Sequence, residues 1–271
     1  MNKKIAVIGV GNMAKAIING IVFADGLDID KIYLFDKNKE ACSPFLNNSV
    51  FEISNDILSA IKRSDYVLLS VKPQNFPEVL DEIEKASGHR NKVYITIAAG
   101  IATQSISKRL GGAVVIRVLP NLPITVGMGV CAICKSETAN ENDFEFVKSI
   151  FRSSGSVTVI DEDEMNRIIG VTSSSPAYVF KFIDAICKGA EAQGLDGDAL
   201  LDAVCDMVIG SAILLKGSKD SPSQLVSKVA SKGGTTEQAL LKLNDYNFDE
   251  AIKEAMLACT ARADELGKTE R

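Results

Sequence analysis

The feature that most constrains the fold of this chain is a glycine-rich turn that begins at residue 9. The short apolar run of residues 3–8 leads directly into the sequence Gly-Val-Gly-Asn-Met-Ala at 9–14. A strand that breaks into such a Gly-x-Gly-x-x-Ala turn and then opens a helix presents bare backbone N–H groups to a pyrophosphate. Gly9 allows the tight turn, Gly11 lets a ligand approach the backbone closely, and Ala14 lets the helix pack on the strand. The turn therefore predicts an α/β domain that binds a dinucleotide, NAD or NADP.

A second strand supports this prediction. Residues 31–36 form a mostly apolar run that ends in Asp36, about 22 residues beyond the turn, near where the residue that contacts the adenosine ribose is expected. An acidic residue at this place favours a free ribose 2′-hydroxyl and hence NADH, whereas Lys37 and Lys39 could neutralise the 2′-phosphate of NADPH. The residues by themselves leave both cofactors open.

Composition argues against several other classes of protein. Of the 271 residues, 46% are hydrophobic and 24% are charged, which is enough apolar material for a packed core in one large domain or in two. The formal net charge of −5 disfavours nucleic acid as the main partner, because there is no basic stripe to bind phosphates. The apolar runs are shorter than the roughly 18 residues that a membrane span needs, and the basic start leads straight into the first strand. We therefore expect neither a membrane span nor a signal peptide.

The cysteines indicate a reducing compartment and no metal centre. Cys131 and Cys134 have C-x-x-C spacing, but zinc would require a second ligand pair, and His89 is the only histidine. The pair lies in a strand-like run rather than at a helix N-terminus, so we interpret both residues as structural and not redox-active. Most of the other cysteines fall on apolar faces, which is typical of a cytoplasmic protein.

The pattern of apolar segments divides the chain near residue 161. Before this point, runs rich in β-branched residues alternate with helical patterns, which predicts a mostly parallel, doubly wound sheet of the Rossmann type over residues 1–161. The predicted strands are 5–8, 32–35, 66–71, 93–98, 114–118, 130–133 and 157–160, and the predicted helices are 13–22, 56–62, 76–85, 103–110 and 142–151.

After residue 161 the patterns are helical throughout, so we expect an all-α second domain over residues 162–271. Two of its helices, 177–193 and 198–215, are apolar on more than one face. Such a helix is either buried in the centre of its domain or part of a subunit interface. We favour the interface, because the helical part is small. The other predicted helices are 163–171, 222–230, 237–243 and 249–266.

Loops that follow the predicted strands could carry part of a site. Residues 71–74 (Val-Lys-Pro-Gln), 98–100 (Ala-Ala-Gly) and 120–123 (Pro-Asn-Leu-Pro) lie at strand ends, where ligands of such sheets bind. Asn121 could offer its amide to a nicotinamide.

A second candidate site lies at the start of a helix in the second domain. Residues 233–236 are Gly-Gly-Thr-Thr, and the two glycines free the backbone directly before the helix. Thr235 and Gln238 have capping-box spacing, and Ser231 and Thr236 add hydroxyl groups. The first N–H groups of the helix would then face a carboxylate, so we predict an anion site here.

In their order along the chain, these motifs resemble the pyrroline-5-carboxylate reductase family. The resemblance rests on residues 9–14, 71–74 and 120–123, on Ser-Ser-Pro-Ala-Tyr at 174–178 and on Gly-Gly-Thr-Thr at 233–236, and it covers essentially the whole chain. It implies an NAD(P)-binding Rossmann domain followed by a helical domain for dimerisation and substrate binding. It also implies homodimers that can assemble further into decamers, and NADPH as the cofactor, with NADH as an alternative.

By position, the resemblance implies roles for individual residues. Ser231, Gly234 and Thr235 would bind the substrate carboxylate. Thr236 would be the catalytic hydroxyl that contacts the ring nitrogen, and Glu162 would lie near the ligand. The implied cofactor contacts are Gly9, Val10, Gly11, Asn12, Met13, Asp36, Asn55, Val71, Lys72, Ala98 and Ala99, to which the residue patterns add Lys37 and Asn121.

The chain departs from the family pattern at several positions. Serines replace two glycines of Ser-Gly-Ser-Gly-Pro, at Ser173 and Ser175. Lys232 replaces the proline of Ser-Pro-Gly-Gly, and Lys228 lies where some members have asparagine. Extra positive charge beside a carboxylate site leaves room for an altered substrate. Leu122 replaces the threonine of Pro-Asn-Thr-Pro, which bears on the nicotinamide contact.

The implied reaction is hydride transfer from the nicotinamide C4 to C5 of 1-pyrroline-5-carboxylate, which gives L-proline in the last step of proline biosynthesis. A protonated cyclic imine is strongly electrophilic, so the protein has mainly to hold the two rings together and to bind the carboxylate. Two alternatives stay open. A 3-hydroxyacid dehydrogenase of similar plan would need a base, for which Lys181 or Lys188 is available. A redox-sensing regulator would bind the cofactor without turning over an imine.

Overall fold

The structure is a computed structural model that describes residues 3–24 and 26–268. By its contacts the chain forms two compact units, one made of the residues up to Ser174 together with those from Leu257 on, and the other of Ser175–Met256. The first unit thus extends beyond the predicted boundary at residue 161. The reason is that Met165 and Ile169 pack with Leu119 and with Ala263 of the last helix, which returns to this unit.

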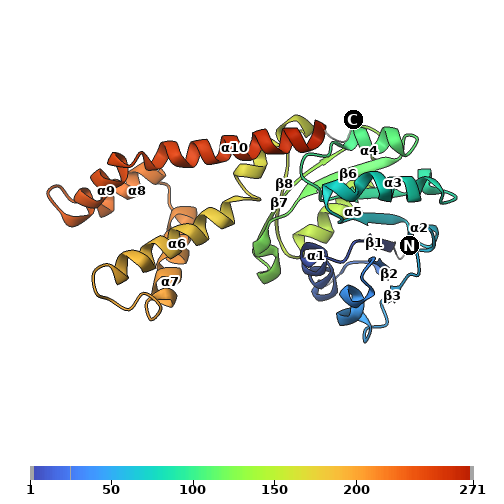
Figure 1. The fold of residues 1–271 in the computed structure, drawn as a ribbon, viewed down its shortest axis with the longest axis horizontal. Helices are drawn as coiled ribbons and strands as arrows, with labels where there is room; N and C mark the ends of the chain where they lie inside the picture. The colour runs from blue at the N-terminus through green and yellow to red at the C-terminus, as the bar shows by residue number, and fades with distance from the viewer. Residues whose placement is uncertain (1–2, 25, 269–271) are drawn as a thin grey trace. The chain divides into compact units, whose positions relative to one another are not determined.

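The first unit is built, within the described residues, on one eight-stranded sheet (Figure 1). The strands lie in the order β3-β2-β1-β4-β5-β6-β7-β8; all neighbours pair in parallel except β6 and β7, which are antiparallel. The predicted doubly wound, mostly parallel sheet is confirmed. The strands are β1 Lys3–Ile8, β2 Ile29–Phe35, β3 Phe51–Ile53, β4 Tyr66–Leu69, β5 Val93–Thr96, β6 Val114–Leu119, β7 Gly129–Lys135 and β8 Gly155–Val159.

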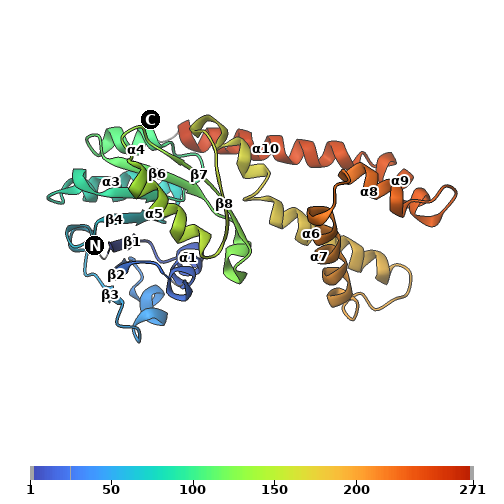
Figure 2. The same ribbon diagram turned by 180° about the vertical axis from the view of Figure 1, so that it is seen from behind.

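Helices cover both faces of the sheet, and the alternation of side chains along β1 decides which helix each face meets. Ile5 and Val7 belong to the core that contains Ile17 of α1, whereas Ala6 and Ile8 belong to the core on the other face. One face carries α1 Asn12–Phe23 and α5 Glu141–Arg152, which lie in front of the sheet in Figure 2. The other carries α2 Ile57–Lys62, α3 Phe76–Glu84 and α4 Thr103–Arg109.

Two sequence predictions for this unit are wrong. β3 was not predicted, because three residues are too short to show a period and only its pairing with β2 makes it a strand. The helix predicted for 163–171 is instead two 3-10 turns, η5 Glu162–Glu164 and η6 Arg167–Gly170. Of the other short 3-10 segments, η1 Lys39–Phe45 and η4 Leu122–Val126 follow β2 and β6.

The second unit contains α6 Ser175–Glu191, α7 Leu201–Gly217, α8 Pro222–Val229, α9 Thr235–Asp245 and the first part of α10 Phe248–Lys268. Figure 2 shows α6 crossing α7. Neither helix has a buried residue in the described structure, and Phe180 and Ile213 are 54% and 65% exposed. A central buried position for these helices in the single chain is therefore wrong. Of the two interpretations, the subunit interface remains.

Within the described residues, no helix is both long enough and apolar enough to cross a bilayer.

Candidate functional site

The glycine-rich turn connects β1 to α1 and is held by both strands that flank β1. Gly9 has a φ of +92°, and a Cβ at this position would lie 2.9 Å from Cγ1 of Val71. The Gly9 N–H donates to the carbonyl of Phe35 over 2.8 Å. Ser70, directly after β4, donates from its hydroxyl to the Gly9 carbonyl over 2.6 Å. Ser70 was not among the predicted site residues, because the predicted strand 66–71 included it, whereas β4 ends at Leu69.

The first turn of α1 is open to a ligand. Gly11 is the N-cap and offers no side-chain cap, and nothing lies within 4 Å of the position that its Cβ would take. The Lys15 N–H is bonded to the Gly11 carbonyl over 2.9 Å, so the N–H groups before it precede the intrahelical ladder. Such N–H groups, at the positive end of a helix dipole, suit a phosphate.

A cavity of about 470 Å³ opens beside this turn, a volume in the range of small-molecule sites. It gathers six of the predicted cofactor residues: Gly9, Gly11, Asp36, Lys37, Val71 and Lys72. Apolar side chains complete its wall, among them Phe35, Ile57 and Val79. An open helix start beside a partly apolar cavity fits the phosphates and the adenine of a dinucleotide. Gln74, from the predicted loop 71–74, also lines the cavity, as do Ser70 and Asn75, which were not predicted.

Asp36 and Lys37 are both already engaged by the protein. The Asp36 carboxylate accepts the Val10 N–H over 2.7 Å and the Asn38 N–H over 2.8 Å, so its position at the end of β2 is fixed. The Lys37 ammonium lies 2.7 Å from each carboxylate oxygen of Glu78 in α3. Because Lys37 lines the cavity, its partner Glu78 also lies close to it. No motif in the sequence indicated Glu78 as a site residue.

The other predicted cofactor residues do not line this cavity. Val10 is fully buried, and Asn55 lies in an exposed bend before α2. Asn12 lines a second cavity of about 360 Å³, together with Lys15 and Asn19. Met13 is half-buried in α1. The predicted contacts of these residues with a cofactor stay predictions.

Asn121 is engaged at both ends of its amide. Its side-chain oxygen accepts the Val130 N–H over 2.9 Å, and its side-chain nitrogen donates to the Thr172 carbonyl over 3.0 Å. The side chain is 6% exposed. The structure therefore gives Asn121 a role in joining β7 to the segment before α6, which differs from the predicted contact with a nicotinamide.

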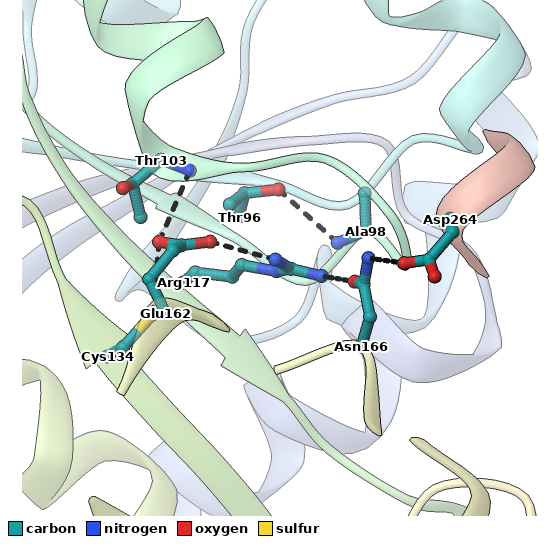
Figure 3. A network of polar contacts seen from close by, with 8 residues as sticks. All are labelled: Thr96, Ala98, Thr103, Arg117, Cys134, Glu162, Asn166 and Asp264. Atoms are coloured by element: carbon teal, nitrogen blue, oxygen red, sulfur yellow. Dashed lines mark hydrogen bonds and ion pairs between the residues drawn. The ribbon is translucent and has the colours of Figure 1, made fainter. Parts of the chain in front are cut away.

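A buried arginine lies below the segment at 98–99 (Figure 3). Arg117 of β6 is 2% exposed and donates to the Glu162 carboxylate over 2.8 Å and to the Asn166 side-chain oxygen over 2.7 Å. Asn166 in turn donates to Asp264 of α10 over 2.7 Å. Thr96, which is fully buried, accepts the Ala98 N–H over 3.3 Å.

The second carboxylate oxygen of Glu162 lies 3.3 Å from the Cys134 sulfur. Burial and then the Glu162 carboxylate raise the pKa of Cys134 far above its ordinary value, so the thiol stays protonated. Burial likewise raises the pKa of Cys131, and both cysteines are free and buried. The interpretation of the C-x-x-C pair as structural stays a prediction. Since the Glu162 carboxylate is held inside the first unit, its predicted place near the substrate stays a prediction.

The Gly-Gly-Thr-Thr segment forms the start of α9. Gly233 has a φ of +73°, which favours glycine, and a Cβ at Gly234 would lie 2.5 Å from the Ser231 hydroxyl, so the Ser231 side chain would have to move. Gly234 is the N-cap, and the predicted capping box of Thr235 with Gln238 is wrong. Glu237 takes the N3 position, and its carboxylate accepts the Gly233 N–H over 2.8 Å. Thr235 is exposed and Thr236 is half-buried, on the first turn beside open N–H groups.

The remaining candidates lie on the surface of the second unit. Lys181 and Lys188 are exposed, and Lys188 pairs with Asp184 over 2.6 Å. Lys228 pairs with Asp220 over 2.6 Å. In the described part of the chain, no three His, Cys, Asp or Glu side chains come close enough together to hold a metal ion.

Two family models match the chain. Residues 162–266 match the model described as pyrroline-5-carboxylate reductase dimerisation, and residues 4–100 match the one described as NADP oxidoreductase, coenzyme F420-dependent. The pyrroline-5-carboxylate reductase of Haemophilus influenzae is 34% identical over 268 residues, with 98% of each chain covered.

Solved structures give the same relationship. The pyrroline-5-carboxylate reductase of Coxiella burnetii is 30% identical, with a TM-score of 0.85 over 98% of this chain and 99% of that one. The Plasmodium falciparum pyrroline carboxylate reductase, solved with NADP bound, has a TM-score of 0.89 over 98% of both chains at 24% identity, which is a likeness of fold.

Proposed function

The chain belongs to the pyrroline-5-carboxylate reductase family, and from this membership we propose that it reduces 1-pyrroline-5-carboxylate to L-proline with NAD(P)H. The observation that carries the proposal is the identity of 34% along 98% of both chains. The open glycine turn, with its neighbouring cavity, and the glycine-opened start of α9 supply the two kinds of anion site that such a reaction requires. Nothing in the site favours the hydroxyacid dehydrogenase, whose candidate lysines lie on an exposed helix face.

The residues divide into two groups by what they bind. Over residues 1–161, the first turn of α1 binds the pyrophosphate and the adjoining cavity holds the adenosine. Over 162–271, the substrate carboxylate binds at Ser231, Gly234 and Thr235, where the open backbone N–H groups of α9 begin at Thr235 and the Ser231 hydroxyl lies beside Gly234. Thr236 contacts the ring nitrogen, and Glu162 lies near the ligand. Val71 and Lys72 line the same cavity, and the remaining cofactor contacts are Val10, Asn12, Met13, Asn55, Ala98 and Ala99.

The reduced nicotinamide supplies a hydride from its C4. The chain itself has to orient the imine and to hold its carboxylate, because an iminium carbon accepts hydride without further activation. Binding the carboxylate at the start of α9 fixes one end of the small ring, and the Thr236 hydroxyl fixes the nitrogen.

The assembly proposed for this enzyme is a homodimer formed by the helical residues, with decamers as the larger form. The exposed apolar side chains of α6 and α7 support it, and the family model that matches 162–266 is one for dimerisation. We place the enzyme in the cytoplasm, because its six cysteines are free thiols, three of them buried.

The test is to supply the purified chain with 1-pyrroline-5-carboxylate and to follow the loss of reduced-nicotinamide absorbance. We expect turnover with release of L-proline, identified by its mass. Oxidation of 3-hydroxyacids, measured in parallel with NAD and NADP, should be absent. Turnover of a hydroxyacid that is lost on Lys181→Ala, without turnover of the imine, would refute the proposal.

A further inference from the structure

We propose that Asp36 and the Lys37–Glu78 ion pair make this enzyme prefer NADH to NADPH, with Glu78 as a specificity residue. The inference rests on the proposed function, since it concerns the cofactor cavity of that reductase. Asp36 lies at the end of β2 and lines the cavity beside the glycine turn. Its two oxygens are fixed by the N–H groups of Val10 and Asn38, at 2.7 Å and 2.8 Å. A carboxylate held in this way cannot turn out of the path of a phosphate, but its free lone pairs can accept from a ribose hydroxyl.

Lys37 is the cation that could have offset this carboxylate. Its ammonium lies 2.7 Å from both oxygens of Glu78, and both side chains are exposed. An exposed ion pair of this kind adds little to the stability of the fold. It matters here because Glu78 engages the Lys37 ammonium, which is then not available to a ligand. To bind a 2′-phosphate, Lys37 would have to leave Glu78, whose carboxylate would then stay unpaired close to the phosphate.

The charged side chains at the β2 end of the cavity therefore carry no excess of positive charge. Asp36, Lys37 and Glu78 together carry one positive and two negative charges, a net charge of −1. Lys72 also lines the cavity, but it follows β4, which flanks β1 on the side opposite β2. That position suits the pyrophosphate at the glycine turn. Lys39 is not among the residues that line the cavity. A doubly charged 2′-phosphate is thus repelled here, whereas a 2′-hydroxyl is not.

The experiment measures the dissociation constants of NADH and NADPH by titration of the oligomeric enzyme in the absence of imine, using the change in nicotinamide fluorescence. We expect the wild type to bind NADH at least about tenfold more tightly than NADPH. Asp36→Ser should reverse this order, because it removes both the ribose acceptor and the fixed negative charge.

Glu78→Gln isolates the contribution of the ion pair. It frees Lys37 without removing it, so NADPH binding should tighten by a factor of about 3 to 10 while NADH binding changes by less than a factor of about 2. Glu82→Gln is the matched control, because Glu82 lies on the same helix and pairs with Lys85 over 2.6 Å outside the cavity lining. It should leave both constants unchanged.

Two results would overturn the proposal: equal or tighter binding of NADPH by the wild type, or the same constants for Glu78→Gln as for Glu82→Gln. Because no imine is present, the outcome is independent of the reaction. A chain that discriminates between the cofactors but does not reduce the imine would refute the proposed function and leave this inference standing.

Discussion

Arg117 brings a positive charge into the interior of the sheet, where an unpaired charge is strongly unfavourable. Glu162 and Asn166 accept hydrogen bonds from two of its guanidinium nitrogens, and the Asn166 side-chain nitrogen donates to Asp264. A buried charge is tolerated only when its partners are well placed, so this network restricts where the chain leaves β8 and where α10 returns. Arg117 is paired in the sheet with Thr96, whose hydroxyl accepts the N–H of Ala98, one of the predicted cofactor contacts.

Thr236 is the single residue on which the proposed chemistry depends most. Its hydroxyl is proposed to contact the ring nitrogen, so Thr236→Ala should lower kcat by a factor of about 10 to 100. The affinity for NADH should stay unchanged, because the glycine turn lies in the other unit. Steady-state kinetics and cofactor titration measure the two quantities. Thr236→Ser, which keeps the hydroxyl, should retain most of the activity, and full activity of the alanine variant would exclude Thr236 from the mechanism.

The C-terminal end of α10 packs closely against Gly100, a glycine in the loop that follows β5. Gly100 follows β5 with a φ of +81°, and a Cβ there would lie 2.5 Å from the carbonyl oxygen of Ala263. Gly267, the residue after the predicted helix 249–266, lies inside the last turn of α10 and faces the Gly100 carbonyl. Two glycines thus allow helix and loop to approach backbone to backbone.

Because of this close approach, we expect an alanine substitution to lower the unfolding free energy more at Gly100 than at Gly112. Gly100→Ala introduces both a strained φ and a clash with Ala263, whereas Gly112→Ala meets a similar φ of +89° with nothing within 4 Å. We expect Gly100→Ala to cost about 2 kcal/mol more unfolding free energy than Gly112→Ala. Urea unfolding followed by circular dichroism gives both values. Equal costs would mean that α10 does not need this contact.

At the scale of the whole molecule, the second unit leaves much of its apolar surface uncovered. Phe180 of α6 and Ile213 and Leu214 of α7 are more than half exposed, and the described residues of α6–α9 include no buried one. Apolar surface of this extent on a small helical unit is typical of an obligate interface. A second copy of the chain is the partner that the dimerisation model over 162–266 favours.

The oligomeric state tests this interface. Light scattering after gel filtration should give a dimer or a larger assembly for the wild type. Ile213→Glu places a charge on the uncovered face and should shift the assembly towards monomer, because burying an unpaired carboxylate is costly. Leu46→Glu is the control, since Leu46 has a similar exposure, 63% against 65%, but lies in the first unit. A monomeric wild type would contradict the prediction.

The sequence determined the features that depend on neighbouring residues. The spacing of Gly9, Gly11 and Ala14 gave the turn after β1, and the runs of β-branched residues gave seven of the eight strands. The positive φ values of Gly9 and Gly233 follow from the same local patterns. Local rules suffice here, because a strand, a turn or a helix start is decided by a few consecutive side chains.

Only the tertiary structure decided which partners the charged and polar groups have. Lys37 meets Glu78 and Arg117 meets Glu162 across 41 and 45 residues, and Asn121 uses its amide to join two distant segments. The strand β3 and the return of α10 to the first unit are also non-local. No spacing along the chain encodes such pairs. They arise because the folded sheet places residues from different crossovers side by side. Burial leaves Arg117 and Asn121 in need of partners, whereas Lys37 and Glu78 meet on the exposed surface.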